Sequence, residues 1–430
     1  MRPRALILGL LTGVLFATVQ LDCRATDYYL DPNNGNLGND GRSRSNAWSS
    51  LAEVAQAGYL HNRVTGGDTL YLMHGKHGRI DVDGLHYNQE VKIVRWREAV
   101  AVLSQFWAED CHNLTLEGLY VTAMLDGYVE QQKGMLVVGR NGGGESSNIK
   151  IHKCTIFSQF DTSGWGAWEW GNRASSGIYV WGTDMEITNN IVQDVHVGIQ
   201  ILGDRIRVQK NWVHRFSGDA MKAAGDDHEF ISNIMTDCFD AYDGYHHDAL
   251  QFYNGRTQVE RAKIIGNIVI HPLDRNRGNI AHLQGIAAFG DVFIDGVVEN
   301  NIVISDTSHG ISLNREAVNT RVVNNTVYGF INGNGSPIRV IGRNNGNVVR
   351  NNLTTNLVVD SGNTQDHNFI VTQANAPEVF VDPDRFLFLI RAEGPAVDTG
   401  EMQDAPEVDF RGCPRPSGAT VDIGAQEHDE

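Results

Sequence analysis

The chain has 430 residues, of which 41% are hydrophobic, and its formal net charge is −17 at pH 7. A chain of this size can bury a large core, and its length alone would permit two or three ordinary domains. The acidic balance argues against a nucleic-acid partner, but an anionic sugar can still bind where a local basic patch or a bound cation lies in a groove.

The first 25 residues have the pattern of a secretory signal peptide. Arg2 and Arg4 are followed by an apolar run from Ala5 to Val19, and small or polar residues end at Ala25. The run is shorter than the roughly 20 apolar residues that a membrane-spanning helix needs. We therefore expect a secreted or periplasmic protein that is not anchored in a membrane.

Four cysteines follow this segment, and they are too few and too scattered for a disulfide-stapled scaffold. We expect them to be small buried side chains: Cys111, Cys154, Cys238 and Cys413. There is no CxxC spacing and no compact Cys/His cluster, so the sequence predicts no zinc site.

An asparagine-centred strand motif recurs through the middle of the chain, with the form apolar, any, apolar, any, Asn, any, apolar. Its anchors are Asn190, Asn211, Asn233, Asn267, Asn301, Asn325 and Asn352, which are 21, 22, 34, 34, 24 and 27 residues apart. Cys154 has the equivalent place in an earlier copy. Strict alternation indicates half-buried strands, and a spacing of this size suits one coil of three short strands.

Asparagine has a physical purpose at a fixed turn position. It tolerates the left-handed region, and its side-chain amide can hydrogen-bond to the asparagine of the next coil. The repeat therefore predicts an all-β, right-handed parallel β-helix with a stacked asparagine ladder. Leucine-rich repeats also place asparagine periodically, but the regular leucines they need do not occur here.

A second strand in each coil begins with a small residue followed by an apolar one. We expect one residue of each copy to point into the core: Ile178, Ile199, Met221, Leu250, Ile286 and Ile311. The residue that follows must then point outward. This outward row reads Tyr179, Gln200, Lys222, Gln251, Ala287 and Ser312.

Segments without the repeat lie at both ends, and we expect them to cover the core, because an open solenoid end exposes apolar side chains and unpaired strand edges. The predicted organisation is a signal peptide at 1–25, an N-terminal cap at 26–75, the β-helix at 76–370 and a closing segment at 371–430.

The outward row offers candidate catalytic groups. Neighbouring parallel strands lie roughly 4.8 Å apart, so Tyr179 and Lys222 would be about 9.6 Å apart with Gln200 between them. Two long side chains can converge on one sugar from that distance. We also include Trp181, on the same strand as Tyr179, among the substrate-binding candidates.

The longest coils lie between Asp219 and Asn267, where loops would form walls over a groove. This stretch supplies His228 and His247 as alternative bases, and Tyr253 and Arg256 as substrate-binding candidates. Three acidic residues in it could bind calcium through oxygen ligands: Asp226, Asp227 and Glu229. A required cofactor is not predicted.

In fold the repeats resemble the secreted β-helix polysaccharide lyases, and the uronate-acting alginate lyases among them in particular. The similarity covers about 320 residues, from Asp27 through the asparagine repeats and the tail around Val421. It implies a monomeric lyase acting on an anionic polysaccharide, favouring alginate. Of the catalytic residues in that family, the resemblance implies only a Tyr/Lys pair here, with Lys222 as the base and Tyr179 as the acid. Three further residues would bind the substrate carboxylate: Gln200, Gln251 and Arg256.

Three alternatives stay open on the same fold. A mannuronan C5-epimerase would use His228 or His247, and a glycoside hydrolase would use two carboxylates, Asp226 and Asp227 or Asp248. A carbohydrate-binding β-helix without catalytic activity is the third.

Overall fold

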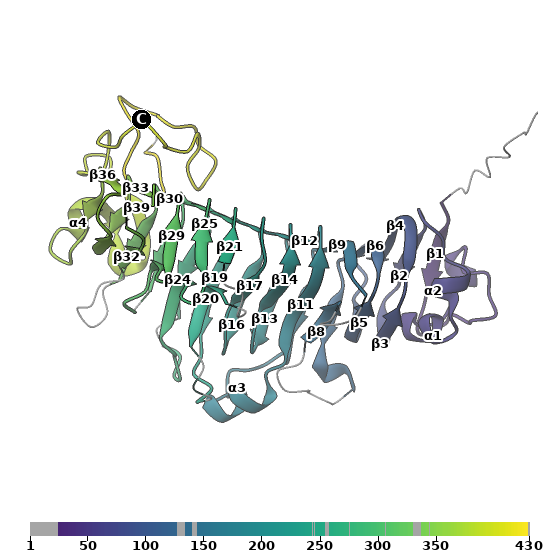
Figure 1. The fold of residues 1–430 in the computed structure, drawn as a ribbon. Helices are drawn as coiled ribbons and strands as arrows, with labels where there is room; N and C mark the ends of the chain where they lie inside the picture. The colour runs from purple at the N-terminus through teal and green to yellow at the C-terminus, as the bar shows by residue number, and fades with distance from the viewer. Residues whose placement is uncertain are drawn as a thin grey trace, which may run out of the picture.

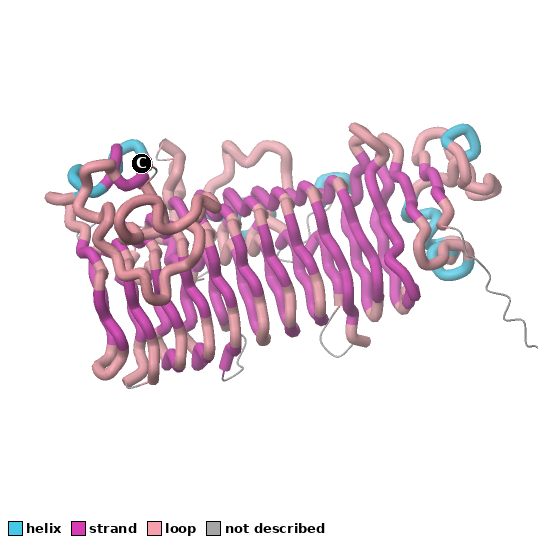
Figure 2. Tube along the Cα trace, turned by 90° about the horizontal axis from the view of Figure 1, so that it is seen from above, coloured by secondary structure: helices cyan, strands magenta, loops and turns pink. Residues whose placement is uncertain are grey.

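The computed structural model describes residues 25–126, 134–139, 144–242, 244, 246–253, 258–274, 276–305, 307–329, 337–343 and 345–428. Parallel strands stack into an elongated solenoid whose ends carry short helices and loops (Figures 1 and 2). Residues 1–24 of the expected signal peptide lie outside the described part. Within that part, none of the helices has the length and apolarity needed to cross a membrane.

Each coil contributes strands to three faces. Face 1 contains β3 (Gly75–Asp83), β5 (Ala101–Glu109), β8 (Gly134–Val138), β11 (Ser176–Thr183), β14 (Ile199–Asp204), β17 (Met221–Ala224), β20 (His247–Phe252), β24 (Leu283–Ala288), β28 (Ile311–Leu313), β32 (Pro337–Val340) and β35 (Asn356–Val359).

Face 2 contains β1 (Asp27–Leu30), β2 (Thr69–Leu72), β4 (His86–Arg95), β6 (His112–Glu117), β9 (Ser146–His152), β12 (Glu186–Thr188), β15 (Arg207–Gln209), β18 (Glu229–Ile231), β22 (Lys263–Ile265), β26 (Val297–Glu299), β30 (Arg321–Val323), β33 (Val348–Arg350) and β36 (Thr364–Asp366). A short parallel set, β21 (Gln258–Glu260), β25 (Val292–Ile294) and β29 (Glu316–Val318), precedes it in three coils.

Face 3 contains β7 (Tyr120–Thr122), β10 (Thr155–Phe157), β13 (Ile191–Val195), β16 (Trp212–Phe216), β19 (Ile234–Cys238), β23 (Ile268–Ile270), β27 (Ile302–Ile304), β31 (Thr326–Tyr328), β34 (Leu353–Thr354) and β37 (Phe369–Ile370). All pairings within the three faces are parallel, so the predicted parallel β-helix is confirmed.

The predicted inward row of face 1 is confirmed. Ile178 pairs in register with Ile199, which pairs with Met221, and the row continues through Leu250, Ile286 and Ile311. Each of these side chains is at most 1% exposed. One continuous apolar core therefore runs along the solenoid.

The asparagine ladder is also confirmed. The Nδ2 of Asn190 donates to Oδ1 of Asn211 at 2.9 Å, and Asn211 donates to Asn233 at 3.0 Å. The same contact repeats through Asn267, Asn301, Asn325 and Asn352 and continues to Asn368. At its N-terminal end the backbone N–H of Cys154 donates to Asn190.

The expected reason for asparagine at this turn is partly wrong. The left-handed backbone conformation belongs to the residue before each ladder asparagine: Asn189, Lys210, Ser232, Gly266, Asn300, Asn324 and Asn351. Several residue types occupy that position, whereas the ladder position needs an amide that donates and accepts at once. Hydrogen bonding, and not backbone conformation, is what selects asparagine there.

Helices and loops cover the N-terminal end. Helix α1 (Leu51–Gln56) has a capping box between Ser50 and Glu53, and α2 (Tyr59–Asn62) follows it. Trp48 is 1% exposed and stacks on Tyr28. Strand β1 of this segment pairs with β2, and β2 pairs with β4, so the parallel sheet extends into the residues expected to cap it.

The C-terminal segment packs along one side of the solenoid as well as at its end (Figure 1). It contains α4 (Ala376–Val379) and the antiparallel pair β38 (Phe380–Asp382) and β39 (Leu387–Ile390). Ile423 and Ala425 belong to the same apolar cluster as Ile302 and Leu353 of face 3. The buried ion pair Arg415–Glu427, 2.6 Å long, lies within this tail.

The four cysteines in the described part of the chain are free thiols. Cys111, Cys154 and Cys238 are buried as expected, whereas Cys413 in the tail is half-buried.

Candidate active site

The outward row of face 1 has the predicted register. Tyr179 pairs with Gln200, Gln200 with Lys222, and Lys222 with Gln251, so the four side chains succeed one another along the solenoid. Ala287 and Ser312 continue the row but are fully buried. The polar, accessible part of the row is therefore confined to the first four positions.

Lys222 is the centre of a compact polar cluster. Its Nζ lies 3.8 Å from Oδ2 of Asp219 and 5.6 Å from the centre of the Tyr253 ring. Asp248 stands beside Asp219 on the next strand, and its backbone N–H donates to Oδ1 of Asp219 at 3.1 Å. Lys222 remains 19% exposed while the Asp219 side chain is completely buried, so a ligand on face 1 can contact the amine and not the carboxyl beneath it.

The two buried carboxyl groups hold protons at unusually high pH. Burial raises the pKa of Asp219 to about 7, against the opposing effect of Lys222. Burial, together with the adjacent Asp219, raises the pKa of Asp248 to about 8. The Nε2 of Gln251 donates to Oδ2 of Asp248 at 2.9 Å. Among the described residues, Oδ1 of Asp248 accepts no hydrogen bond, which further disfavours its ionised form.

This pair predicts a pH-dependent stability. Because both pKa values lie above those of the unfolded chain, the folded protein holds more protons between about pH 4 and pH 8, and its stability falls as the pH rises through that range. We expect Asp248→Asn to reduce that loss by on the order of 1–3 kcal/mol. Chemical denaturation at pH 5 and pH 8.5 measures the free energy of unfolding of both proteins, and hence the difference.

A matched control is Asp184→Asn. Hydrogen bonding to Arg205 lowers the pKa of this exposed carboxyl, so it is ionised throughout the same range. If both variants reduced the pH dependence of the stability equally, that dependence could not be assigned to the buried pair Asp219 and Asp248.

Tyr179 and Trp181 lie on β11 near this cluster, and both are partly buried. Burial raises the pKa of Tyr179 above its usual value of 10. Its hydroxyl is therefore protonated at neutral pH and can donate a proton or a hydrogen bond. Tyr253, 53% exposed, stands on the other side of Lys222. Tyr253 thus lies next to the amine, whereas Tyr179 lies two strands before it on the same face, with Gln200 between them.

His247 begins β20 and lines a shallow pocket of about 450 Å³ together with His246, His282 and Gln284. Gln284 pairs in register with Asp248. Strand β20, which contributes His247 to this pocket, also carries Asp248 of the Lys222 cluster. His247, 9% exposed, therefore remains a candidate base at this pocket, four residues before Gln251, the strand partner of Lys222.

His228 does not reach the groove. It is 0% exposed, its Nδ1 accepts from the backbone N–H of Ile206 at 3.3 Å, and its Nε2 lies 3.2 Å from the carbonyl oxygen of Ala224. Burial lowers its pKa, so it is neutral. A side chain held in the core by two backbone contacts cannot act on a polymer, and its assignment as an alternative base is wrong. Arg256 lies outside the described residues.

The acidic turn proposed for calcium is occupied by ion pairs. Arg261 contacts Asp227 at 2.6 and 2.9 Å, and Glu229 pairs with Arg207 at 2.7 Å and with Lys263 at 3.0 Å. Oδ1 of Asp226 accepts from the backbone N–H of Glu260. These contacts join neighbouring coils of face 2, away from the Lys222 row of face 1.

Asp219 is the residue of the cluster that the sequence predictions did not include. A signal was present: Asp-Ala-Met-Lys at 219–222 and Asp-Ala-Leu-Gln at 248–251 place aspartate three residues before the outward position in two successive coils. In the preceding copies Ser176 and Val197 take that place. A stacked pair of carboxyl groups next to Lys222, the single lysine of the outward row, could therefore have been inferred from the sequence.

Comparisons with known proteins agree with this architecture. Residues 176–354 match the family model described as right handed beta helix region. A solved pectate lyase, Pel9A, superposes with a TM-score of 0.50 at 14% identity, over 94% of this chain and 96% of its own. The search of curated protein sequences gave no match.

Two further structures are similar at lower scores. The A-module of the Azotobacter vinelandii mannuronan C-5 epimerase AlgE6 has a TM-score of 0.44 at 13% identity, over 75% of this chain and 93% of its own. A GH136 lacto-N-biosidase from Eubacterium ramulus has 0.46 at 12% identity, over 80% of this chain and 68% of its own. Identities this low speak to the fold alone, and the chain is a right-handed parallel β-helix protein.

Proposed function

We propose that the chain is a secreted or periplasmic polysaccharide lyase that cleaves a uronate-containing polymer by β-elimination, with alginate as the favoured substrate. The observation that carries the proposal is the Lys222 amine, 19% exposed on face 1, which lies 5.6 Å from the Tyr253 ring and 3.8 Å from the buried Asp219 carboxyl, next to Asp248. A pectate lyase has the same fold over nearly its whole length.

The chemistry requires a base, an acid and a group that neutralises the substrate carboxylate. The base removes the proton at C5, the electron pair forms the C4–C5 double bond, and the bond from C4 to the leaving oxygen breaks. Hydrogen bonds to the uronate carboxylate stabilise the negative charge that develops at C5. The amides of Gln200 and Gln251, one strand to either side of Lys222, are suited to that contact.

The buried carboxyl pair explains how a lysine can act as base. Before the reaction the amine must be neutral, and its proton needs an acceptor. Oδ2 of Asp219, 3.8 Å away, is suited to receive it because the pKa of this carboxyl is already raised to about 7. Asp219 and Asp248 are thus positioning residues.

Tyr179 is proposed as the acid that protonates the leaving oxygen. We expect Tyr179→Phe to lower kcat by about 10²-fold or more while changing KM little, because it removes a proton donor and keeps the ring. Steady-state kinetics on the preferred polymer measures the effect. A change in KM alone would mean that the hydroxyl only binds substrate.

The activity itself is tested by incubating the mature protein with alginate, pectate, hyaluronan and chondroitin, with a neutral glucan as control. A lyase yields shortened, unsaturated products that absorb in the ultraviolet. Reducing ends without this absorbance would instead identify a hydrolase, and altered uronate composition without shortening would identify an epimerase. An unchanged polymer in every case would leave a carbohydrate-binding role and overturn the proposal.

A further inference from the structure

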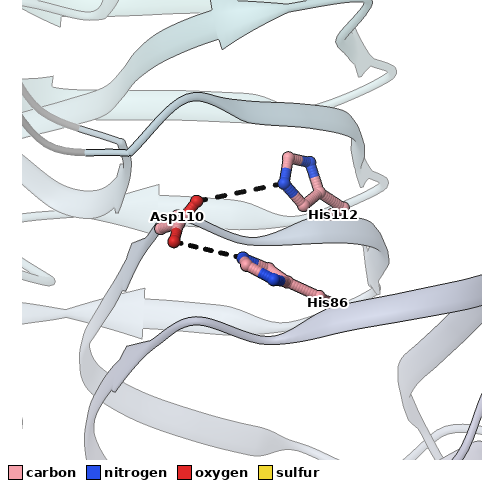
Figure 3. A group of neighbouring side chains, drawn as sticks. All are labelled: His86, Asp110 and His112. Carbon is pink, nitrogen blue, oxygen red and sulfur yellow. Dashed lines mark ion pairs between the residues drawn. The ribbon is translucent and has the colours of Figure 1, made fainter.

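Two histidines and an aspartate converge on face 2 near the N-terminal end of the solenoid (Figure 3). Nε2 of His86 lies 3.1 Å from Oδ2 of Asp110, and Nε2 of His112 lies 3.9 Å from Oδ1 of the same carboxylate. One ligand atom from each residue lies within 4.8 Å of the other two. The cluster is partly open to solvent and belongs to a different face from Lys222.

The parallel register produces this convergence. His86 opens β4 and pairs directly with His112, which opens β6, so the two rings stand 4.8 Å apart, centre to centre. Asp110 lies in the turn just before β6, in the left-handed conformation with φ of 47°. Gly144 passes so close that a Cβ at that position would collide with the Asp110 carboxylate. The backbone therefore holds the carboxylate against the two rings.

A second contact orients one imidazole. Nδ1 of His112 is 2.8 Å from Oγ of Ser147, which lies on β9 in register with His112. In the tautomer in which Nδ1 carries the ring proton and donates it to Ser147, Nε2, the atom that faces Asp110, has a free lone pair. Outer contacts of this kind are typical of histidines that bind metals.

We propose that His86, Asp110 and His112 bind a first-row transition metal ion of the zinc class. Two imidazoles and one carboxylate are ligands that Zn²⁺ accepts, whereas Ca²⁺ and Mg²⁺ prefer sites made of oxygen atoms only. Ligand atoms around tetrahedral zinc are about 3.3 Å apart, so the observed separations need only a small closure. Three protein ligands leave a coordination position for water.

Metal here would join the first residues of two neighbouring strands, β4 and β6, and the turn before β6, across consecutive coils. The proposal is independent of the proposed lyase activity, because it concerns another face of the solenoid and its test measures metal binding and not turnover.

The test uses the mature protein, stripped with a chelator and titrated with Zn²⁺ alone by calorimetry. We expect one equivalent to bind tightly, and Co²⁺ to give the visible absorption bands of a nitrogen-ligated site. His86→Ala, His112→Ala and Asp110→Asn should each weaken Zn²⁺ binding by well over tenfold, and Ser147→Ala by about tenfold or more. Ca²⁺ should not compete.

The control is His367→Ala. His367 also forms a 3.1 Å contact with an aspartate, Asp366, at the far end of face 2, but it is not part of the three-residue group. Binding that survives in all three ligand variants, or that falls equally in His367→Ala, would overturn the proposal. Circular dichroism and the cooperativity of melting check that each variant is folded, and the conservative Asp110→Asn and Ser147→Ala keep the test decisive where a histidine variant fails to fold.

Discussion

Replacing Lys222 by alanine is expected to lower kcat by about 10²–10⁴-fold, which is the range that a positioned general base contributes. The fold should persist, because the side chain points outward and does not contribute to the core that Met221 and Ala223 of β17 help to form. Lys222→Arg should not restore turnover, since a guanidinium stays charged and cannot accept the proton. Initial rates of formation of the unsaturated product measure both variants.

Lys263→Ala is a suitable control. Lys263 is an exposed lysine on face 2, paired with Glu229 at 3.0 Å and remote from the outward row of face 1. Its loss should leave turnover unchanged. If Lys222→Ala keeps substantial activity while His247→Ala loses it, the base is the histidine at the pocket beside β20, as the epimerase alternative requires.

Asn211→Leu is expected to destabilise the protein by on the order of 3–5 kcal/mol. Oδ1 of Asn211 accepts from both the backbone N–H and the Nδ2 of Asn190, at 3.0 and 2.9 Å, and its Nδ2 donates to Ile187 and Asn233. Leucine has nearly the same volume but leaves these buried partners without hydrogen bonds, at about 1–3 kcal/mol for each. Urea unfolding followed by circular dichroism gives the difference.

The matched control is Asn172→Leu in α3 (Ala167–Arg173). That asparagine is exposed and makes one side-chain hydrogen bond, to the carbonyl oxygen of Trp168. Its replacement should cost less than about 1 kcal/mol. Equal costs at the two positions would mean that the ladder contributes little beyond an ordinary surface amide.

The periodic part of the chain could be predicted to the level of single side chains. Alternation along a strand decides which residues face the core, so the positions of Ile199 and Lys222 followed from their spacing within the repeat. The asparagine ladder followed in the same way. These predictions succeed because every coil repeats one local pattern, so the assignment of a position in one coil can be checked against the same position in the others.

The parts that could not be predicted depend on residues outside the repeat. His228 lies in a turn just before β18, where no alternation indicates whether a side chain points inward, and it lies in the core. Asp110 meets His86 only because of a left-handed turn that sequence spacing does not reveal. The tail packs against face 3 through contacts between residues far apart in sequence, such as the hydrogen bond from the backbone N–H of Ala425 to Oγ1 of Thr326, 99 positions away.

The asparagine ladder has a consequence for how such a protein can diversify. The amide contact is 2.9 Å both between Asn190 and Asn211, which are 21 positions apart, and between Asn233 and Asn267, which are 34 apart. Coil spacing is thus insensitive to the length of the intervening loop. Insertions at the corners can reshape the walls beside Lys222 while the scaffold keeps its dimensions, so new specificities can arise through changes in loop length before any strand residue is exchanged.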